Sequence, residues 1–147
     1  MTTMRQRAAE GLQVGDRFMI SRSFTADDIA LFAQLSRDHN PVHGDDGYIA
    51  LKGFKAPIAH GLLTASLMTE IGGQIGWLAA SMSLRFKRPV YAGEMLHCEW
   101  LIAEIDERRR AKAIIHVTNP DGLTVLEAES TGVLPNEAER ERLKALL

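Results

Sequence analysis

Residues 38–43, which read DHNPVH, contain the side chains of this sequence best suited to proton transfer. They include a carboxylate, Asp38, and an imidazole, His43, and both kinds of group serve as general acids and bases in enzymes. Further along, residues 57–62 read PIAHGL, and Gly61 stands where an apolar helix is expected to begin. A backbone N–H at a helix N-terminus stabilises negative charge. A proton-transfer pair together with such an N–H is the minimal set of groups needed to add or remove water beside a thioester carbonyl.

A helix and a turn are expected to bring the carboxylate and the imidazole together. Thr25 begins a sequence typical of a capping box, and apolar residues at helical spacing follow it, so residues 25–37 are predicted to form an amphipathic helix. Pro41 disfavours helical geometry at Asn40, so the chain is expected to turn there. The carboxylate would then lie at the end of one helix and the imidazole on the following loop, with the two side chains able to converge.

A buried helix and a set of strands make up the rest of the predicted fold. From Gly61 the apolar residues cover most of the helical wheel, with Glu70 as the exception, and the pattern changes to strand-like alternation after Gly72 and Gly73. A helix that is apolar nearly all round needs a sheet to cover it. The sequence therefore predicts an α+β fold in which an antiparallel sheet wraps around a central helix. The expected strands are residues 17–24, 82–86, 96–103, 111–117 and 123–133, with short helices at 45–51 and 136–147.

The bulk properties are those of a single domain spanning residues 1–147, with a core at about 16–134 and a charged, mostly exposed C-terminal helix at 136–147. A net charge of −2 argues against a nucleic-acid-binding protein. The single cysteine, Cys98, excludes an internal disulfide, and no apolar run approaches the ~20 residues of a membrane span. No apolar stretch follows the N-terminal arginines, so no secretory signal is predicted and a cytoplasmic protein is expected.

Four stretches of the sequence resemble one protein family. Residues 24–36, the pattern DxNPxH at 38–43, PIxHG at 57–61 and FxxPVxxGE at 86–94 closely resemble the MaoC-like (R)-specific enoyl-CoA hydratases, and the resemblance covers about residues 16–134. It implies a hot-dog fold, a homodimer, and reversible hydration of trans-2-enoyl-CoA to (R)-3-hydroxyacyl-CoA. It implies no cofactor apart from the coenzyme A of the substrate.

The resemblance also assigns roles to individual residues. Asp38 and His43 correspond to the catalytic pair, and the Gly61 N–H corresponds to the group that binds the thioester oxygen. Asn40 and His60 lie within the matched motifs and are expected beside the substrate. His60 is better suited to bracing the loop before the buried helix than to transferring protons.

A basic cluster, Arg85, Lys87 and Arg88, overlaps the start of the last matched stretch. Arginine and lysine are the residues that most often bind phosphate groups, so this cluster is expected to hold the phosphates of coenzyme A. A second basic run at residues 108–110 is the alternative phosphate site.

The sequence departs from the fuller members of the family near the expected acyl pocket. Between Gly73 and Leu84 it is about four residues shorter and lacks a Pro-Gly-x-Gly element, and Ser81 stands where those members carry a glutamine. Trp77 and Met82 can fill space that a longer loop would shape. A preference for short or medium acyl chains is therefore expected.

Other interpretations of the same residues stay open from the sequence. His39 is a rival imidazole. Asp38, His43 and His60 are together conceivable metal ligands, but nothing in their spacing fixes a coordination geometry, so no metal site is predicted. The enzymatic alternatives are a hot-dog thioesterase and an acyl-carrier-protein dehydratase, and the alternative of another class is a non-catalytic acyl-CoA-binding subunit. A convergent acid and base favour the hydratase, because a binding module has no use for them.

Overall fold

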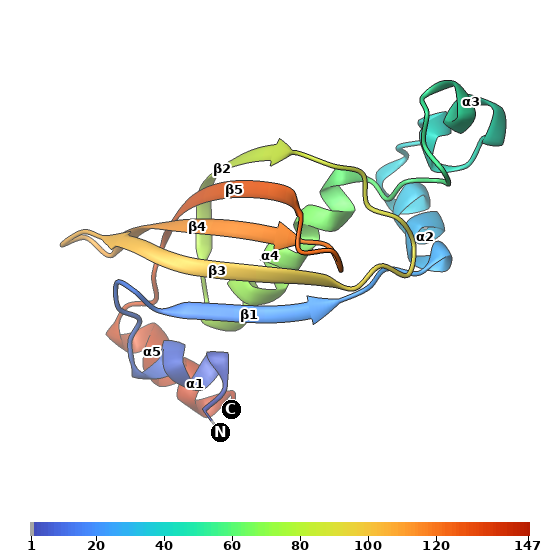
Figure 1. The fold of residues 1–147 in the computed structure, drawn as a ribbon. Helices are drawn as coiled ribbons and strands as arrows, with labels where there is room; N and C mark the ends of the chain where they lie inside the picture. Colours follow the sequence, from blue (N-terminus) through green and yellow to red (C-terminus); the bar gives the residue numbers. More distant parts are fainter. Residues whose placement is uncertain (1) are drawn as a thin grey trace.

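The helix α4 (Gly61–Ile75) lies against one face of a five-stranded antiparallel sheet in the computed structural model, which describes residues 2–147 (Figure 1). Across the sheet the order is β1 (Arg17–Arg22), β3 (Leu96–Ile105), β4 (Arg110–Thr118), β5 (Thr124–Val133) and β2 (Leu78–Phe86). All neighbouring strands run antiparallel. This arrangement confirms the predicted α+β architecture of an antiparallel sheet around a central helix.

Helix α4 is buried because its side chains are apolar on nearly every side. Leu67, Met68, Ile71 and Ile75 are each at most 1% exposed, whereas Glu70, the predicted exception, is exposed. Burying a side chain of this size contributes about 1.5–3 kcal/mol to folding. The helix is therefore the centre of the core, and its start is held in a fixed place relative to the sheet.

The helix continues past the change of pattern at Gly72 and Gly73 as far as Ile75, and it stops at Gly76, whose φ of 69° is left-handed. Gly72 is buried, and a Cβ there would lie 3.6 Å from the Trp100 ring. Close packing of helix on sheet therefore outweighs the ~1 kcal/mol that a glycine costs inside a helix.

Strands β3, β4 and β5 bury alternate side chains against α4, as their period-two sequence pattern predicts. Trp100 of β3 pairs with Ile115 of β4, which pairs in turn with Ala128 of β5. These three side chains share the covered face, and each is at most 5% exposed.

The edge strand β2 carries apolar side chains that the described chain does not cover. Met82, Leu84 and Phe86, which were predicted to share one face, pair with core-facing residues of β5. Met82 is nevertheless 48% exposed and Phe86 55% exposed, because no other strand among residues 2–147 pairs with the outer side of β2. The strand therefore leaves an apolar edge beside α4.

Helices α2 (Ala26–Ser36) and α3 (Asp46–Leu51) lie at one end of the sheet, and a short 3-10 turn, η1 (Pro41–His43), connects them (Figure 1). Both helices are close to their predicted positions. Thr25 caps α2 through a capping box with Asp28, as the sequence predicts. This end of the molecule positions the DHNPVH segment.

Two terminal helices, α1 (Met4–Glu10) and α5 (Glu137–Ala145), pack against each other beside the sheet (Figure 1). Every residue of α5 is at least partly exposed, as predicted. Helix α1 is an addition to the predicted elements, and its Ala8 joins the hydrophobic core. Within residues 2–147, no helix combines the length and the apolar character that a membrane span requires.

Candidate active site

The turn after α2 is held together by its own side chains. Helix α2 ends at Ser36, and the next residue, Arg37, has a left-handed φ of 60°, so the chain changes direction before Asp38. Asp38 Oδ1 accepts a hydrogen bond from the Asn40 N–H at 3.1 Å, and Asn40 Oδ1 accepts one from the Val42 N–H at 3.2 Å. Asp38 Oδ2 thereby comes within 3.8 Å of His43 Nε2. Two groups at this separation can each reach one water molecule at about 2.8 Å.

The surroundings of His43 determine which ring nitrogen can accept a proton. Nδ1 lies 2.7 Å from the carbonyl oxygen of Ile58, and since a carbonyl oxygen only accepts hydrogen bonds, Nδ1 carries the hydrogen. In the neutral ring Nε2 is then unprotonated, and it is the nitrogen nearer to the Asp38 carboxylate. The side chain of His43 is 11% exposed, against 49% for Asp38. The imidazole is therefore held rigidly while the carboxylate stays open to solvent.

Gly61 is the first residue of α4, so its N–H is one of those at a helix start that have no partner within the helix. A Cβ at this position would lie 2.6 Å from Phe86 Cε1, which shows that the Phe86 ring packs directly on the glycine. Any other side chain at this position would displace the ring.

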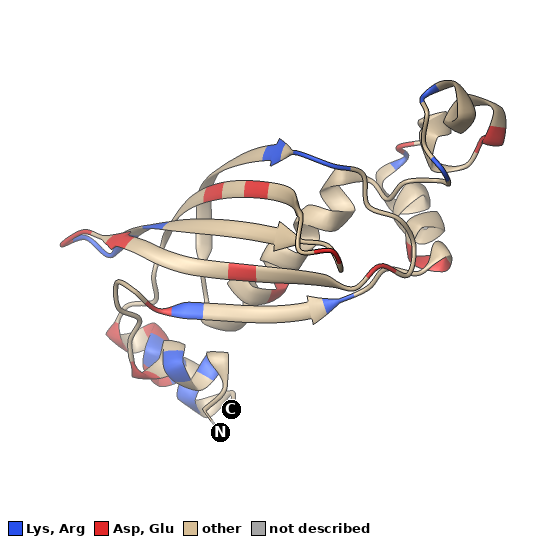
Figure 2. Cartoon of the chain, viewed as in Figure 1, with Lys and Arg blue, Asp and Glu red and all other residues tan. Residues whose placement is uncertain are grey.

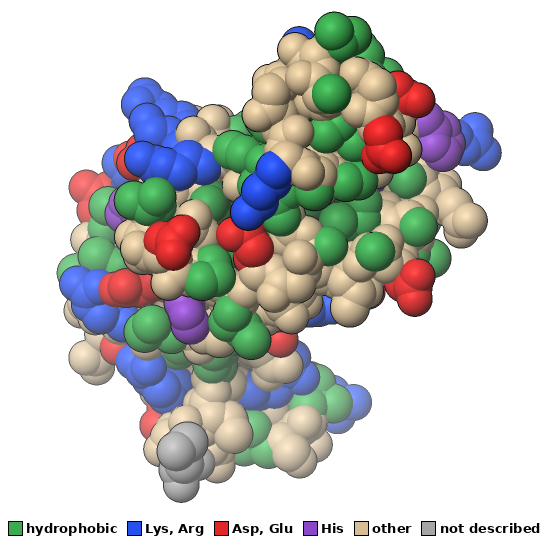
Figure 3. Space-filling view, turned by 45° about the vertical axis from the view of Figure 1, so that its right-hand side comes forward, with side chains coloured by type: hydrophobic (Ala, Val, Ile, Leu, Met, Phe, Trp, Pro, Cys, Tyr) green, Lys and Arg blue, Asp and Glu red, His purple; other side chains and the backbone are tan. Residues whose placement is uncertain are grey.

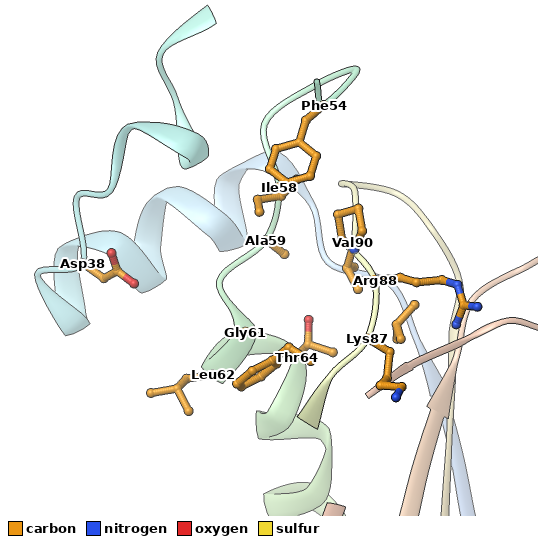
Figure 4. A pocket seen from close by; sticks show the side chains of 13 residues that line it. Asp38, Phe54, Ile58, Ala59, Gly61, Leu62, Thr64, Lys87, Arg88 and Val90 are labelled. Atoms are coloured by element: carbon orange, nitrogen blue, oxygen red, sulfur yellow. The ribbon is translucent and has the colours of Figure 1, made fainter. Parts of the chain in front are cut away.

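Asp38 and Gly61 line the same pocket, which has a volume of about 450 Å³ (Figure 4). Figure 4 shows Asp38 on one side, Lys87 and Arg88 on the opposite side, and Gly61 and Thr64 of α4 below. An apolar pocket with a few convergent polar groups is the usual form of a small-molecule site. The rest of the lining is apolar: Phe54, Ile58, Ala59, Leu62, Phe86, Pro89, Val90 and Val125.

The outer surface around this pocket is also largely apolar. In the space-filling view, hydrophobic side chains gather beneath α3, at the end of the molecule that carries the DHNPVH turn (Figure 3). Basic residues follow the end of β2 (Figure 2). Lys87 and Arg88 belong to this basic segment and reach the pocket from that side.

A second, more polar depression of about 370 Å³ borders the other side of the pair. Asp38 lines both cavities, whereas His43, His39, Asn40 and Asp45 line only the polar one. Asn40, which was expected beside the substrate, uses its side-chain oxygen within the turn. It therefore shapes the turn and does not line the apolar pocket.

His60 was also expected beside the substrate, but the structure buries it beneath His43. It is 1% exposed, and its ring stacks on the His43 ring with centroids 3.6 Å apart and planes inclined by 23°. Its Nε2 lies 3.0 Å from the backbone carbonyl oxygen of Asp38. Burial lowers the pKa of His60 below its ordinary value of 6.5, although the hydrogen bond to Asp38 acts in the opposite direction. His60 therefore braces the site from behind.

The structure does not bring Arg85 to the pocket. Side chains alternate along β2, so Arg85 points away from α4, and it lines a separate depression with Glu127, its partner on β5. Ser81 lies on the same outer side of the sheet, with its Oγ 2.5 Å from Thr131 Oγ1. Neither residue contributes to the lining of the pocket in this chain.

Asp38, His43 and His60 each offer one ligand atom, and these atoms lie within 4.8 Å of one another. The geometry nevertheless does not suit a metal ion. The lone pairs of two stacked, nearly parallel imidazoles do not converge on one point at the ~2.0 Å that a zinc–nitrogen bond requires. In addition, His60 Nε2 lies at hydrogen-bonding distance from a carbonyl oxygen and so carries a hydrogen.

Thr64 lines the pocket although no motif in the sequence indicates it. It is 3% exposed and lies one helical turn after Gly61 on α4. Helical side chains lean toward the N-terminus, so its hydroxyl points to the Gly61 end of the helix. The spacing of three residues from Gly61 is the signal that could have identified it.

Comparison with known proteins gives consistent matches. A family model described as "MaoC like domain" matches residues 12–125. The (R)-specific enoyl-CoA hydratase of Aeromonas caviae is 37% identical over 115 residues, which are 76% of this chain and 84% of that protein. The mitochondrial 3-hydroxyacyl-[acyl-carrier-protein] dehydratase of Arabidopsis thaliana is 34% identical over 132 residues, covering 85% of this chain and 79% of that protein. The solved structure of an R-hydratase from Pseudomonas aeruginosa matches with a TM-score of 0.80 and 33% identity, covering 88% of this chain and 86% of that one.

Proposed function

The chain belongs to the family of MaoC-like domains and has the hot-dog fold, and from this premise we propose that it is an (R)-specific enoyl-CoA hydratase. As a hydro-lyase it would reversibly add water to trans-2-enoyl-CoA and form (R)-3-hydroxyacyl-CoA. The observation that carries the proposal is the position of Asp38 Oδ2, 3.8 Å from His43 Nε2 and at the edge of the pocket that also contains Gly61.

The carboxylate and the imidazole act together on one water molecule. Asp38 Oδ2 and His43 Nε2 are both hydrogen-bond acceptors when His43 is neutral, so one water can donate to both. As the C3–O bond forms, the pair takes one proton from this water. The pair then gives one proton to C2 of the enoyl group. The pair thereby returns to its starting charge. No cofactor apart from the coenzyme A of the substrate takes part.

The negative charge that develops on the thioester oxygen is stabilised at the start of α4. The Gly61 N–H donates to this oxygen, and the helix dipole favours negative charge at the same place. Removing one such donor typically lowers kcat by about 10²–10³. The direct packing of Phe86 on Gly61 keeps this part of the pocket narrow.

Coenzyme A would extend from this point toward Lys87 and Arg88 on the opposite side of the pocket. The Arg88 guanidinium also donates to the Thr124 carbonyl oxygen at 2.5 Å, which fixes its position. Lys87 and Arg88 would therefore meet the phosphates, and Arg85 would not.

The preference for short or medium acyl chains stays a prediction. Ser81, one of the departures that suggested this preference, does not line the pocket. Measurement of kcat/KM over a series of enoyl chain lengths tests it.

We also propose that the protein is a homodimer, located in the cytoplasm. An unpaired strand edge invites association, and Leu78, Met82 and Phe86 expose apolar surface along β2. Leu62 of α4 adds to this surface with 60% exposure. Sedimentation analysis should show a dimer, and a stable monomer at micromolar concentration would contradict this part of the proposal.

One assay separates the hydratase from its alternatives. The purified protein is given crotonyl-CoA and, separately, crotonyl-acyl-carrier protein, while loss of the enoyl group and release of free thiol are followed together. A hydratase removes the enoyl absorbance of crotonyl-CoA without releasing thiol and gives the (R) product. Release of thiol would indicate a thioesterase, and preference for the carrier-protein substrate would indicate a dehydratase like the Arabidopsis relative. Binding without turnover would indicate a non-catalytic subunit, and an (S) product would refute the assignment.

A further inference from the structure

Two histidines tie the two halves of the site to each other. The first segment of the site is residues 38–43, and the second is residues 57–62. His43, on the first segment, donates from Nδ1 to the carbonyl oxygen of Ile58 on the second segment at 2.7 Å. His60, on the second segment, donates from Nε2 to the carbonyl oxygen of Asp38 on the first at 3.0 Å. Each segment therefore supplies an imidazole to the backbone of the other. The residue after His60 is Gly61, so the same tie connects the acid–base pair with the oxyanion donor.

The ring of His60 is also a packing surface. It stacks on the His43 ring at 3.6 Å, and the Phe32 ring of α2 lies on it at 4.9 Å with an inclination of 56°. Because His60 is only 1% exposed, the position of the His43 ring depends on a surface that solvent does not reach.

The hydrogen-bonding pattern requires a neutral His60. Its Nε2 carries the hydrogen donated to Asp38, whereas its Nδ1 is buried and has no hydrogen-bond partner within residues 2–147. A second proton on Nδ1 would place an unsatisfied charge in the interior. Burial is the main cause that lowers the pKa of His60, and the neighbouring His43 and His39 act in the same direction, against the Asp38 carbonyl and carboxylate.

We propose that His60 is a positioning residue for this site, which holds the Asp38 backbone through Nε2–H and the His43 ring through stacking. This inference rests on the proposed hydratase function. His60 does not contact the substrate, because it lies behind His43 and outside the lining of the pocket. Its contribution is to fix the distance between the carboxylate and the imidazole, and a displacement of about 1 Å in such a pair can lower kcat by about 10².

Two substitutions separate the hydrogen bond from the stacking. In His60→Gln the amide nitrogen occupies the place of Nε2 and keeps the donor, but no ring lies under His43. In His60→Phe the ring stays and the donor is lost. His116→Gln, the same chemical change at an exposed imidazole of β4 outside both cavities that border the pair, is the matched control. Circular dichroism and thermal unfolding establish that each variant is folded.

For the folded variants we expect kcat on crotonyl-CoA to fall by about 10- to 100-fold, with KM changed less than about twofold because the pocket lining is intact. His116→Gln should keep the wild-type kcat. A wild-type kcat in both His60 variants would overturn the proposal, as would a rise in KM that matches or exceeds the fall in kcat.

A second measurement does not depend on activity or on the variants. The imidazole nitrogen NMR shifts of the wild-type protein should identify His60 as the Nε2–H tautomer and His43 as the Nδ1–H tautomer at neutral pH. The opposite tautomer at His60 would overturn the positioning role even if a variant fails to fold. If the tautomers are as expected but the wild type does not hydrate crotonyl-CoA, the function is refuted and the role of His60 in the geometry stands.

Discussion

Replacing Asp38 by asparagine tests the proposed chemistry with the least structural disturbance. The carboxylate Oδ2 lies 3.8 Å from His43 Nε2, so both groups can hold the same water. An amide has nearly the shape of a carboxylate but cannot take a proton. Removing one positioned proton carrier lowers kcat by about 10²–10⁴, which corresponds to about 2.7–5.4 kcal/mol in activation free energy.

The same substitution should leave folding almost unchanged. Asparagine Oδ1 can still accept the hydrogen bond from the Asn40 N–H that Asp38 Oδ1 accepts at 3.1 Å. The Asp38 side chain is 49% exposed, and substitutions at such sites usually change the free energy of unfolding by about 0.5 kcal/mol or less. A loss of activity without a loss of stability is therefore the expected signature.

The assay compares Asp38→Asn, His43→Ala and the double variant by the loss of the enoyl absorbance of crotonyl-CoA. Because the pair acts as one unit, the double variant should lose no more than about tenfold beyond the worse single variant. Asp45→Asn is the matched control: its side chain caps α3 by accepting from the Tyr48 N–H at 2.8 Å, and asparagine caps equally well. Turnover near the wild-type rate in folded Asp38→Asn, or additive losses in the double variant, would refute the mechanism.

Three further perturbations have distinct expected results. Lys87→Ala should raise KM about tenfold with little change in kcat, because a charged contact worth about 1.4 kcal/mol is lost. Arg85→Ala should change neither KM nor kcat, and equal effects of the two variants would move the phosphate site to the outer face of the sheet. Gly61→Ala places a Cβ 2.6 Å from Phe86, so kcat should fall about 10²-fold, and part of the loss should be recovered when Phe86→Ala is added. A wild-type kcat in Gly61→Ala alone would show that the Phe86 ring moves aside without cost. The free energy of unfolding should fall as the pH decreases below 6.5, because the unfolded state, in which the pKa of His60 is not lowered, takes up a proton before the folded state does. The contribution of His60 to this pH dependence is at most about 1.4 kcal/mol per pH unit, and it should be absent in His60→Gln. The free energies of unfolding are measured by denaturant titration at several pH values, and an equal dependence on pH in the wild type and in His60→Gln would contradict the prediction.

The features that local sequence dictates could be predicted. Thr25 and its capping box place the start of α2, and the period-two pattern places the buried faces of β3, β4 and β5. The approach of Asp38 to His43 was also predictable, because Pro41 and the Asn40 side chain form the turn within six residues. The cap and the turn join residues close together in the chain, and the period-two pattern can be read within each strand on its own.

The features that depend on contacts between distant segments could not be predicted. The continuation of α4 through Gly72 depends on the Trp100 ring of β3, which lies far along the chain. The separation of Arg85 from Lys87 depends on where β2 ends, since alternation holds only within the strand. The burial of His60 needs both segments of the site to be in place, so the motif alone suggested a substrate contact.

Phe86 connects the pocket with the proposed dimer surface. Its ring packs on Gly61, yet it is 55% exposed on the uncovered edge of β2. In a dimer formed through this edge, the partner would limit the positions of the ring and so keep the oxyanion end of the pocket narrow. Met82→Glu places a charge on the same face of β2 without altering the pocket lining, so it should shift the protein toward monomers and lower kcat about tenfold. Sedimentation and specific activity are measured over the same range of concentrations. A monomeric Met82→Glu variant with the wild-type kcat would refute this role of the partner, because a single chain would then be sufficient to hold the Phe86 ring in place.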